Sequence, residues 1–97
     1  MDELIKEIDL SDYRDKFENI HDFNFDDNLY YHLIHNEKAL EVEFKVSLSF
    51  YNGEIDNIEI DIKELNIWVN GGIKIEVNYP TILKVEQKIL EQLKELY

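Results

Sequence analysis

The stretch from Leu40 to Phe50, LEVEFKVSLSF, decides the fold of this chain. Its apolar residues alternate without a break against polar ones, and a period of two is typical of a strand with one buried and one wet face. The apolar positions are Leu40, Val42, Phe44, Val46, Leu48 and Phe50. The segment therefore predicts a half-buried strand of an antiparallel sheet.

A turn signal, Tyr51-Asn52-Gly53, follows this strand, and apolar alternation resumes at Ile58, Ile60 and Ile62. A two-residue Asn-Gly loop in a regular ladder would set Val46 opposite Glu59, on the wrong face. A three-residue loop ending at Gly53 avoids this conflict, so we predict it. The resulting pairs would be Val46 with Ile58, Phe44 with Ile60, Val42 with Ile62, Lys45 with Glu59 and Glu41 with Lys63.

The apolar positions then change parity, from even at Ile62 to odd at Leu65. A β-bulge near Lys63-Glu64 would produce this change, which favours one long bent strand over two short ones. A second three-residue loop, Asn70-Gly71-Gly72, predicts a returning strand over 73–77. Its predicted pairs are Ile67 with Ile75, Leu65 with Val77, and Trp68 with Lys74 on the other face.

Helices are predicted at both ends of the sheet. Pro80 cannot continue a ladder, and an apolar stripe predicts a helix from residue 81 onward. Ser11 is a suitable N-cap for a helix over 11–21, with Leu4, Ile5 and Ile8 forming an earlier turn. Residues 29–35 fit a strand better than a helix, although both remain open. The fold class is α+β: one domain over 1–97, an antiparallel meander of three to four strands with an N-terminal and a C-terminal helix on one face.

Composition narrows the range of functions. The 97 residues carry a formal net charge of −12 and include no cysteine, which excludes disulfides and thiolate metal sites. Arg14 is the single arginine, and direct nucleic-acid binding needs the basic clusters that this chain lacks. No apolar run approaches a membrane span, and the acidic start does not fit a signal peptide. We therefore expect a cytoplasmic protein that acts without a cofactor, a membrane or direct nucleic-acid contact.

The stretch around residues 21–35 looks most like a chemical site. Asp22, Asn24 and Asp26 match the first ligand positions of a calcium-binding EF-hand loop, but Asp27 stands where glycine is needed and Leu33 where a bidentate glutamate belongs. An acidic turn explains the stretch more simply. His32 and His35, with His21 nearby, would share a face only on a helix, so a metal-binding protein centred here is an alternative that we rank below the others.

Signatures of catalysis are otherwise lacking. The sequence contains no phosphate-binding glycine loop, dinucleotide fingerprint or nucleophile elbow, and Ser47 and Ser49 come with no adjacent base. We therefore expect a protein that is not an enzyme.

The acidic surface remains as the main functional signal. Rows of carboxylates can imitate the phosphate backbone for a protein whose groove binds nucleic acid, and an aromatic side chain can anchor such an interface. The leading hypothesis is a binding or inhibitor protein of phage or mobile-element type that engages a basic, nucleic-acid-handling protein. Its candidate contacts are Asp12, Asp15, Glu18 and Asp22 on the first helix and Glu43, Glu59, Asp61 and Trp68 on the open sheet face. Glu41 adds a carboxylate to that face, and Tyr51 and either Tyr30 or Tyr31 are further candidate anchors. The alternative is a homo-oligomer or adaptor that uses apolar surface of the last helix, where Leu83, Leu90 and Tyr97 widen the stripe.

Overall fold

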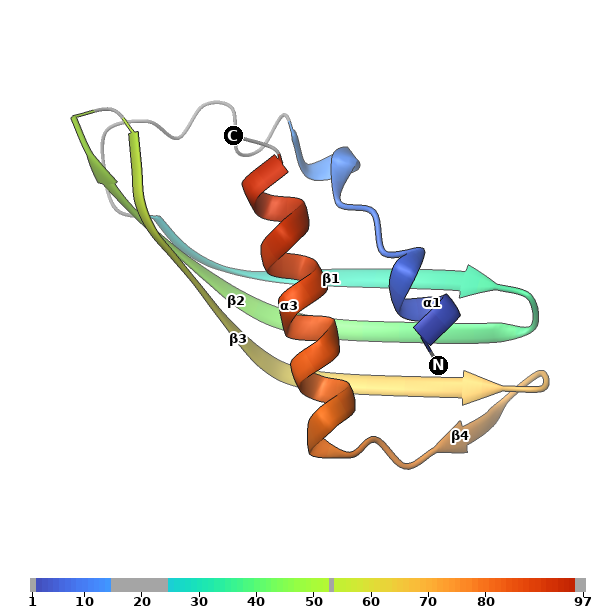
Figure 1. Cartoon of the computed structure of the whole chain (residues 1–97). Helices are drawn as coiled ribbons and strands as arrows, with labels where there is room; N and C mark the ends of the chain where they lie inside the picture. The colour runs from blue at the N-terminus through green and yellow to red at the C-terminus, as the bar shows by residue number, and fades with distance from the viewer. Residues whose placement is uncertain (1, 15–24, 53, 96–97) are drawn as a thin grey trace.

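The computed structural model describes residues 2–14, 25–52 and 54–95, and it confirms the α+β fold class. Four strands form one antiparallel sheet in the order β1-β2-β3-β4. They are β1 (Phe25–His35), β2 (Lys38–Tyr51), β3 (Glu54–Val69) and β4 (Ile73–Ile75). Two helices, α1 (Asp2–Lys6) and α3 (Tyr79–Glu95), cover one face of the sheet, and the other face is open (Figure 1).

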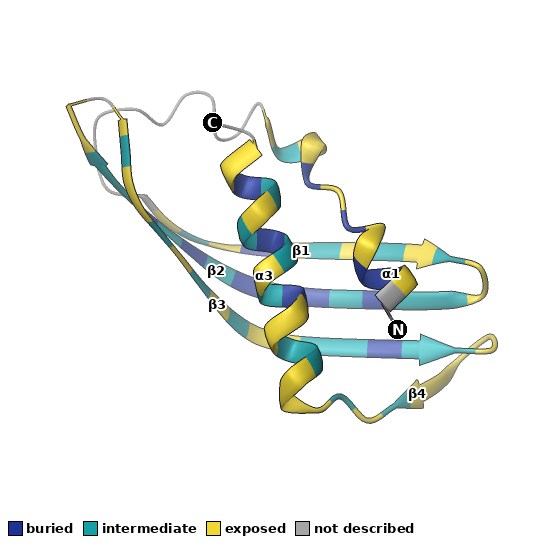
Figure 2. Ribbon diagram, viewed as in Figure 1, coloured by how far each residue is buried: buried dark blue, intermediate teal, exposed yellow. Residues whose placement is uncertain are grey.

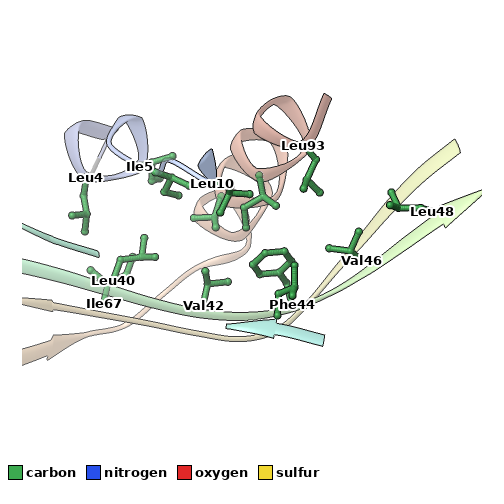
Figure 3. Packing of buried hydrophobic residues seen from close by; sticks show 14 residues of the cluster. Leu4, Ile5, Leu10, Leu40, Val42, Phe44, Val46, Leu48, Ile67 and Leu93 are labelled. Atoms are coloured by element: carbon green, nitrogen blue, oxygen red, sulfur yellow. The ribbon is translucent and has the colours of Figure 1, made fainter. Parts of the chain in front are cut away.

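The hydrophobic core lies between this sheet face and the helices. The alternating residues of β2 point toward α1 and α3, as Figure 3 shows for Leu40, Val42, Phe44, Val46 and Leu48. Val85, Ile89 and Leu93 of α3 complete the core from above, together with Ile67 and Leu29 from the neighbouring strands. No polar or charged residue among the described ones is buried. The burial pattern in Figure 2 therefore follows the sequence alternation, and the polar residues of β2 are left on the open face.

The N-terminal segment is a larger part of this core than its weak helical signal indicates. Leu4, Ile8 and Leu10 are buried, and the 3-10 turn η1 (Ser11–Tyr13) follows them. The Leu10 N–H donates to Gln92 Oε1 at 3.3 Å, and the Asp9 N–H donates to the Tyr31 hydroxyl at 3.0 Å. These bonds join the segment to α3 and to β1.

The prediction of a strand for residues 29–35 is confirmed, since they belong to β1. β1 pairs with β2 from Phe25–Leu48 to His35–Lys38, so residues 36–37 form a two-residue turn. Asn36 and Glu37 both have positive φ, of 48° and 63°. Such angles are typical of the tight hairpin turn whose twist matches that of the flanking strands.

The predicted register between β2 and β3 is wrong. Tyr51 pairs directly with Glu54, so the connection is the two-residue Asn-Gly loop, with Asn52 at a φ of 53°. A bulge opposite Ser49/Phe50 then inserts one residue, Asp56, and restores the match of apolar faces that the longer loop was meant to provide. The observed pairs are Val46 with Ile60, Phe44 with Ile62, Val42 with Leu65, Lys45 with Asp61 and Glu41 with Asn66.

The predicted bulge near Lys63-Glu64 is confirmed, because Glu43 pairs with Glu64 while Phe44 pairs with Ile62. β3 is accordingly one long strand, which bends where it passes under α3 (Figure 1). The pairs Ile67–Ile75 and Trp68–Lys74 are also confirmed. β4, however, ends at Ile75, so the predicted strand over 73–77 is too long and Leu65 has no ladder partner at Val77.

The last helix begins earlier than predicted. α3 starts at Tyr79, and Pro80 lies in its first turn, where a missing N–H costs no helical bond. The Asn78 side chain caps it, with Oδ1 accepting from the Thr81 N–H at 3.0 Å. Of the predicted helix over 11–21, Ser11–Tyr13 form a 3-10 turn and residues 15–21 lie outside the described residues. Ser11 is the first residue of that turn and does not cap it, since Leu10 occupies the cap position.

Candidate partner-binding face

The open face of the sheet collects the polar residues that alternate with the core. Cross-strand neighbours share a face, so the observed register assigns each of them. Across from the core positions Leu40 to Leu48 of β2, the carboxylates on this face, called the acidic face below, are Asp26, Glu41, Glu43, Glu59, Asp61 and Glu64. Asp26, Glu43, Glu59, Asp61 and Glu64 are exposed, and Glu41 is half-buried.

Two carboxylates of this face stand directly against each other. Glu43 on β2 pairs with Glu64 on β3, which sets their Cβ atoms about 5 Å apart. Neither lies within ion-pair distance of a lysine in the described part of the chain. Glu64 Oε1 accepts a hydrogen bond from a neutral group, the Asn66 side-chain amide, at 3.1 Å. Like charges placed in this way destabilise a sheet.

Tyr30 continues this row on β1, directly beside Glu43. The pKa of the Tyr30 phenol is raised, mainly because its hydroxyl donates a hydrogen bond to the Glu41 carboxylate. Desolvation and the negative charges of Glu41 and Glu64 raise this pKa further. The ring is 55% exposed. The centre of the acidic face thus holds three carboxylates around one exposed aromatic ring.

Lysines compensate the carboxylates nearer the β2–β3 hairpin. Lys45 Nζ lies 3.1 Å from Asp26 Oδ2, and Lys63 Nζ lies 2.7 Å from Asp61 Oδ2. The hydrogen bond to Asp61 and the negative charges around it raise the pKa of the Lys63 ammonium. These pairs are solvent-exposed and contribute little to stability. The carboxylates of this face without a lysine in ion-pair contact among the described residues are therefore Glu41, Glu43, Glu59 and Glu64.

An apolar hollow adjoins the acidic face at the end of the sheet away from the hairpin. Its volume is about 460 Å³, and its lining is made up of His32, Ile34, Glu37, Lys38, Ala39, Glu41, Trp68, Gly71 and Gly72. Trp68 is half-buried, and Ile34 is 70% exposed. Lys74 stands opposite Trp68 on β4. The hollow offers a site where an apolar side chain of a partner would be desolvated next to the carboxylates.

The sequence-predicted contacts are only partly assembled. Glu43, Glu59, Asp61 and Trp68 all lie on one face, as expected. On the predicted first helix, Asp12 is exposed, whereas Asp15, Glu18 and Asp22 lie outside the described residues. Of the aromatic residues near the sheet, Tyr31 turns toward the helices, where its hydroxyl accepts from Asp9.

The sequence alone predicts Glu41 on this face, because it shares the alternation of Glu43, and it offers Tyr30 or Tyr31 as an aromatic anchor. The pairing of β1 with β2 places Tyr30 on the open face. Glu64 was missed, because its position opposite Glu43 depends on the exact place of the bulge, which the local pattern does not give.

The candidate metal stretch does not form a loop where it is described. Asp26, Asp27 and Leu33 lie on β1, and His32 and His35 differ by three positions on this strand and so point to opposite faces. Among the described residues, no group of three or more histidine, aspartate or glutamate side chains is placed to hold a metal ion. Asp22, Asn24 and His21 lie outside those residues.

Ser47 of the open face contacts a carboxylate and lies far from the histidine of the same face. Ser47 Oγ donates to Asp26 Oδ1 at 3.3 Å. His32 shares this face but lies six residues from Asp26 along β1, about 20 Å away.

Comparison of the chain with protein-family models, with curated proteins and with solved structures finds no match in any of the three. No helix in the described part of the chain is long and apolar enough to cross a membrane.

Proposed function

We propose that this protein is a non-enzymatic binding protein whose acidic face engages a basic protein, with nucleic-acid-handling proteins as the first class of partner. The observation that carries the proposal is the direct opposition of Glu43 and Glu64, with Glu41 next to them. Folding places these carboxylates together with no lysine in ion-pair contact among the described residues, and the charge of Lys63 near Glu43 offsets only part of the repulsion, so the arrangement costs stability. A cationic partner would neutralise the repulsion between these carboxylates, and the relief of that repulsion would add to the free energy of binding.

The apolar hollow at Trp68 supports the proposal from a second direction. Charge gives fast association and selectivity, whereas affinity comes mainly from a few desolvated aromatic anchors. Trp68 lies on the same face as the carboxylates and lines a hollow of about 460 Å³. An interface that covers both the carboxylates and this hollow would combine electrostatic attraction of the partner with an apolar anchor. Replacing Trp68 by Ala should then weaken binding by about 2 kcal/mol or more.

The experiment that tests this function is capture of a partner from a cell lysate at low and at high salt, followed by competition with DNA or RNA. An electrostatic partner should bind at about 50 mM salt and dissociate as the salt rises toward about 200 mM. If that partner normally holds nucleic acid in the same groove, added DNA or RNA should displace the protein. A partner that resists salt and ignores nucleic acid would contradict the proposal.

A second candidate function is self-association through α3. Leu83 is 44% exposed on this helix, and a hollow of about 400 Å³ beside it is lined by Leu83, Lys84, Glu86, Gln87 and Leu90. Sedimentation at increasing protein concentration tests this candidate. A dimer that is lost on Leu83→Lys would favour it over the acidic face.

A further inference from the structure

The outer edge of β3 is unpaired along most of its length. β4 pairs only with Ile67, Trp68 and Val69, and within the described residues no strand pairs with the same edge from residue 54 to residue 66. The outward N–H and C=O groups of this edge therefore have no ladder partner. Such an edge is a template for an added strand, and peptide-binding domains use it in this way.

A groove runs between this edge and α3. A hollow of about 490 Å³ is lined by Ile58, Glu59, Ile60 and Asp61 of β3, Glu86 and Leu90 of α3, and Lys45 and Ser47 of β2. A second hollow, of about 330 Å³, continues toward the hairpin and shares Ile58 and Leu90 with the first. Figure 1 shows α3 crossing the sheet beside the bend of β3. An extended segment on the edge would therefore have a helix along one of its faces.

The two sides of the edge differ in chemistry. Ile58 and Ile60 face α3 and are only half-buried, and Leu90 of α3 is half-buried with them. Glu59 and Asp61 alternate with these isoleucines and belong to the acidic face. An added strand would present successive side chains to these two environments in turn.

A second copy of the chain fits this edge less well than a basic segment, because carboxylates outnumber lysines along residues 54–66 of β3. Antiparallel pairing of two β3 edges would bring the exposed acids of one copy, including Asp56, Glu59 and Asp61, close to those of the other. Like charges on neighbouring strands are destabilising, and charged edge residues are a common means of preventing such contacts. The lining of the first hollow holds three carboxylates, Glu59, Asp61 and Glu86, against one lysine, Lys45, so charge complementarity favours a basic strand.

From these observations we infer that the β3 edge takes up an extended segment of a partner protein as a fifth strand, and that this segment alternates basic and apolar residues. The inference rests on the proposed function and names its mode of recognition: basic side chains meet Glu59 and Asp61, and apolar ones enter the groove against Leu90. Backbone hydrogen bonds along β3 supply the rest of the affinity.

The test uses three synthetic peptides and the full-length protein. The first peptide, acetyl-KIKVKIKVK-amide, has the inferred alternation. The second has the same composition in separate basic and apolar blocks. The third has the first sequence with N-methyl groups on alternate amides, which removes the hydrogen-bond donors of one edge and keeps the charge. The alternating peptide should bind at least about tenfold more tightly than the other two, a difference of about 1.4 kcal/mol or more.

Hydrogen exchange locates the bound peptide. Alternate amides between residues 54 and 66 should gain protection when the alternating peptide binds, because only those N–H groups point outward to the new strand. Leu90→Lys should abolish the tighter binding of the alternating peptide relative to the other two peptides. Leu83→Lys, which makes the same substitution on the same helix at a residue that does not line the groove, should leave it unchanged.

The outcomes separate this inference from the proposed function. Equal, salt-sensitive binding of all three peptides without protection of β3 would overturn strand addition and leave the acidic face as a charge-only site. Absence of binding by every peptide at low salt would overturn both. If the amides of the β3 edge became protected from hydrogen exchange when the protein concentration was raised without peptide, a second copy would occupy the edge. That result would also overturn the inference.

Discussion

Neutralising one member of the Glu43–Glu64 pair should stabilise the protein. The two carboxylates face each other across β2 and β3, and cross-strand charge pairs contribute about 0.2–1 kcal/mol. The positive charge of Lys63, whose field reaches Glu43, offsets part of the repulsion. Glu43→Gln should therefore raise the free energy of unfolding by about 0.5 kcal/mol. For a domain of this size that corresponds to a rise in Tm of about 2–4 °C.

The assay is thermal unfolding followed by circular dichroism at low and high salt. The gain should shrink as salt screens the pair. Glu64→Gln should give a similar gain, and the double variant should give little more than either single one, because removal of one charge already removes the repulsion. Glu59→Gln is the matched control: it removes a carboxylate from the same face, on the same strand as Glu64, but one that stands opposite the neutral Ser47.

A stabilisation by Glu59→Gln as large as that by Glu43→Gln would refute this reasoning. It would mean that the effect comes from total charge and not from the opposed pair. A loss of stability on Glu43→Gln would refute it more strongly, because it would show that the carboxylate makes a favourable contact in the folded protein.

Three further predictions concern the core, a helix cap and the tyrosine of the acidic face. Phe44→Ala should cost about 3–5 kcal/mol in urea unfolding, since the ring is fully buried, and a loss below about 1 kcal/mol would contradict the core described above. Asn78→Ala should cost about 1 kcal/mol and Asn78→Asp much less, because only the latter keeps the oxygen that caps α3. Tyrosine absorbance should show Tyr30 titrating above its usual pKa and returning toward it in Glu41→Gln. As the folded pKa of Tyr30 is raised, its contribution to stability is present below the unfolded pKa and lost as pH rises through the folded one.

The strands were predictable because their signal is local. Alternation over residues 40–50 fixes which side chains of β2 enter the core, and the parity change after Ile62 locates a bulge that the structure contains. The register was not predictable in the same way. A three-residue loop and a two-residue loop followed by a bulge both satisfy the alternation of this hairpin. The structure has the second arrangement, and its bulge residue, Asp56, cannot be recognised from the apolar pattern.

The acidic face illustrates a related difficulty. Glu43, Glu59 and Asp61 could be assigned to one face from alternation alone, but the pairing that opposes Glu43 to Glu64 depends on both bulges. The N-terminal segment was underestimated for a different reason. A five-residue helix has almost no intrinsic helical stability, and α1 exists because Leu4 packs against the sheet.

The most direct test of the central claim compares two variants with the same net charge. One replaces Glu41, Glu43 and Glu64 of the acidic face by Gln, and the other replaces Glu76, Glu91 and Glu95, which are exposed outside it. Binding of the captured basic partner is measured for both as a function of salt. The account predicts that the acidic-face variant binds at least about tenfold more weakly, by about 1.4 kcal/mol, and with a shallower salt dependence, while the other stays close to wild type. Equal affinities for the two variants would contradict it.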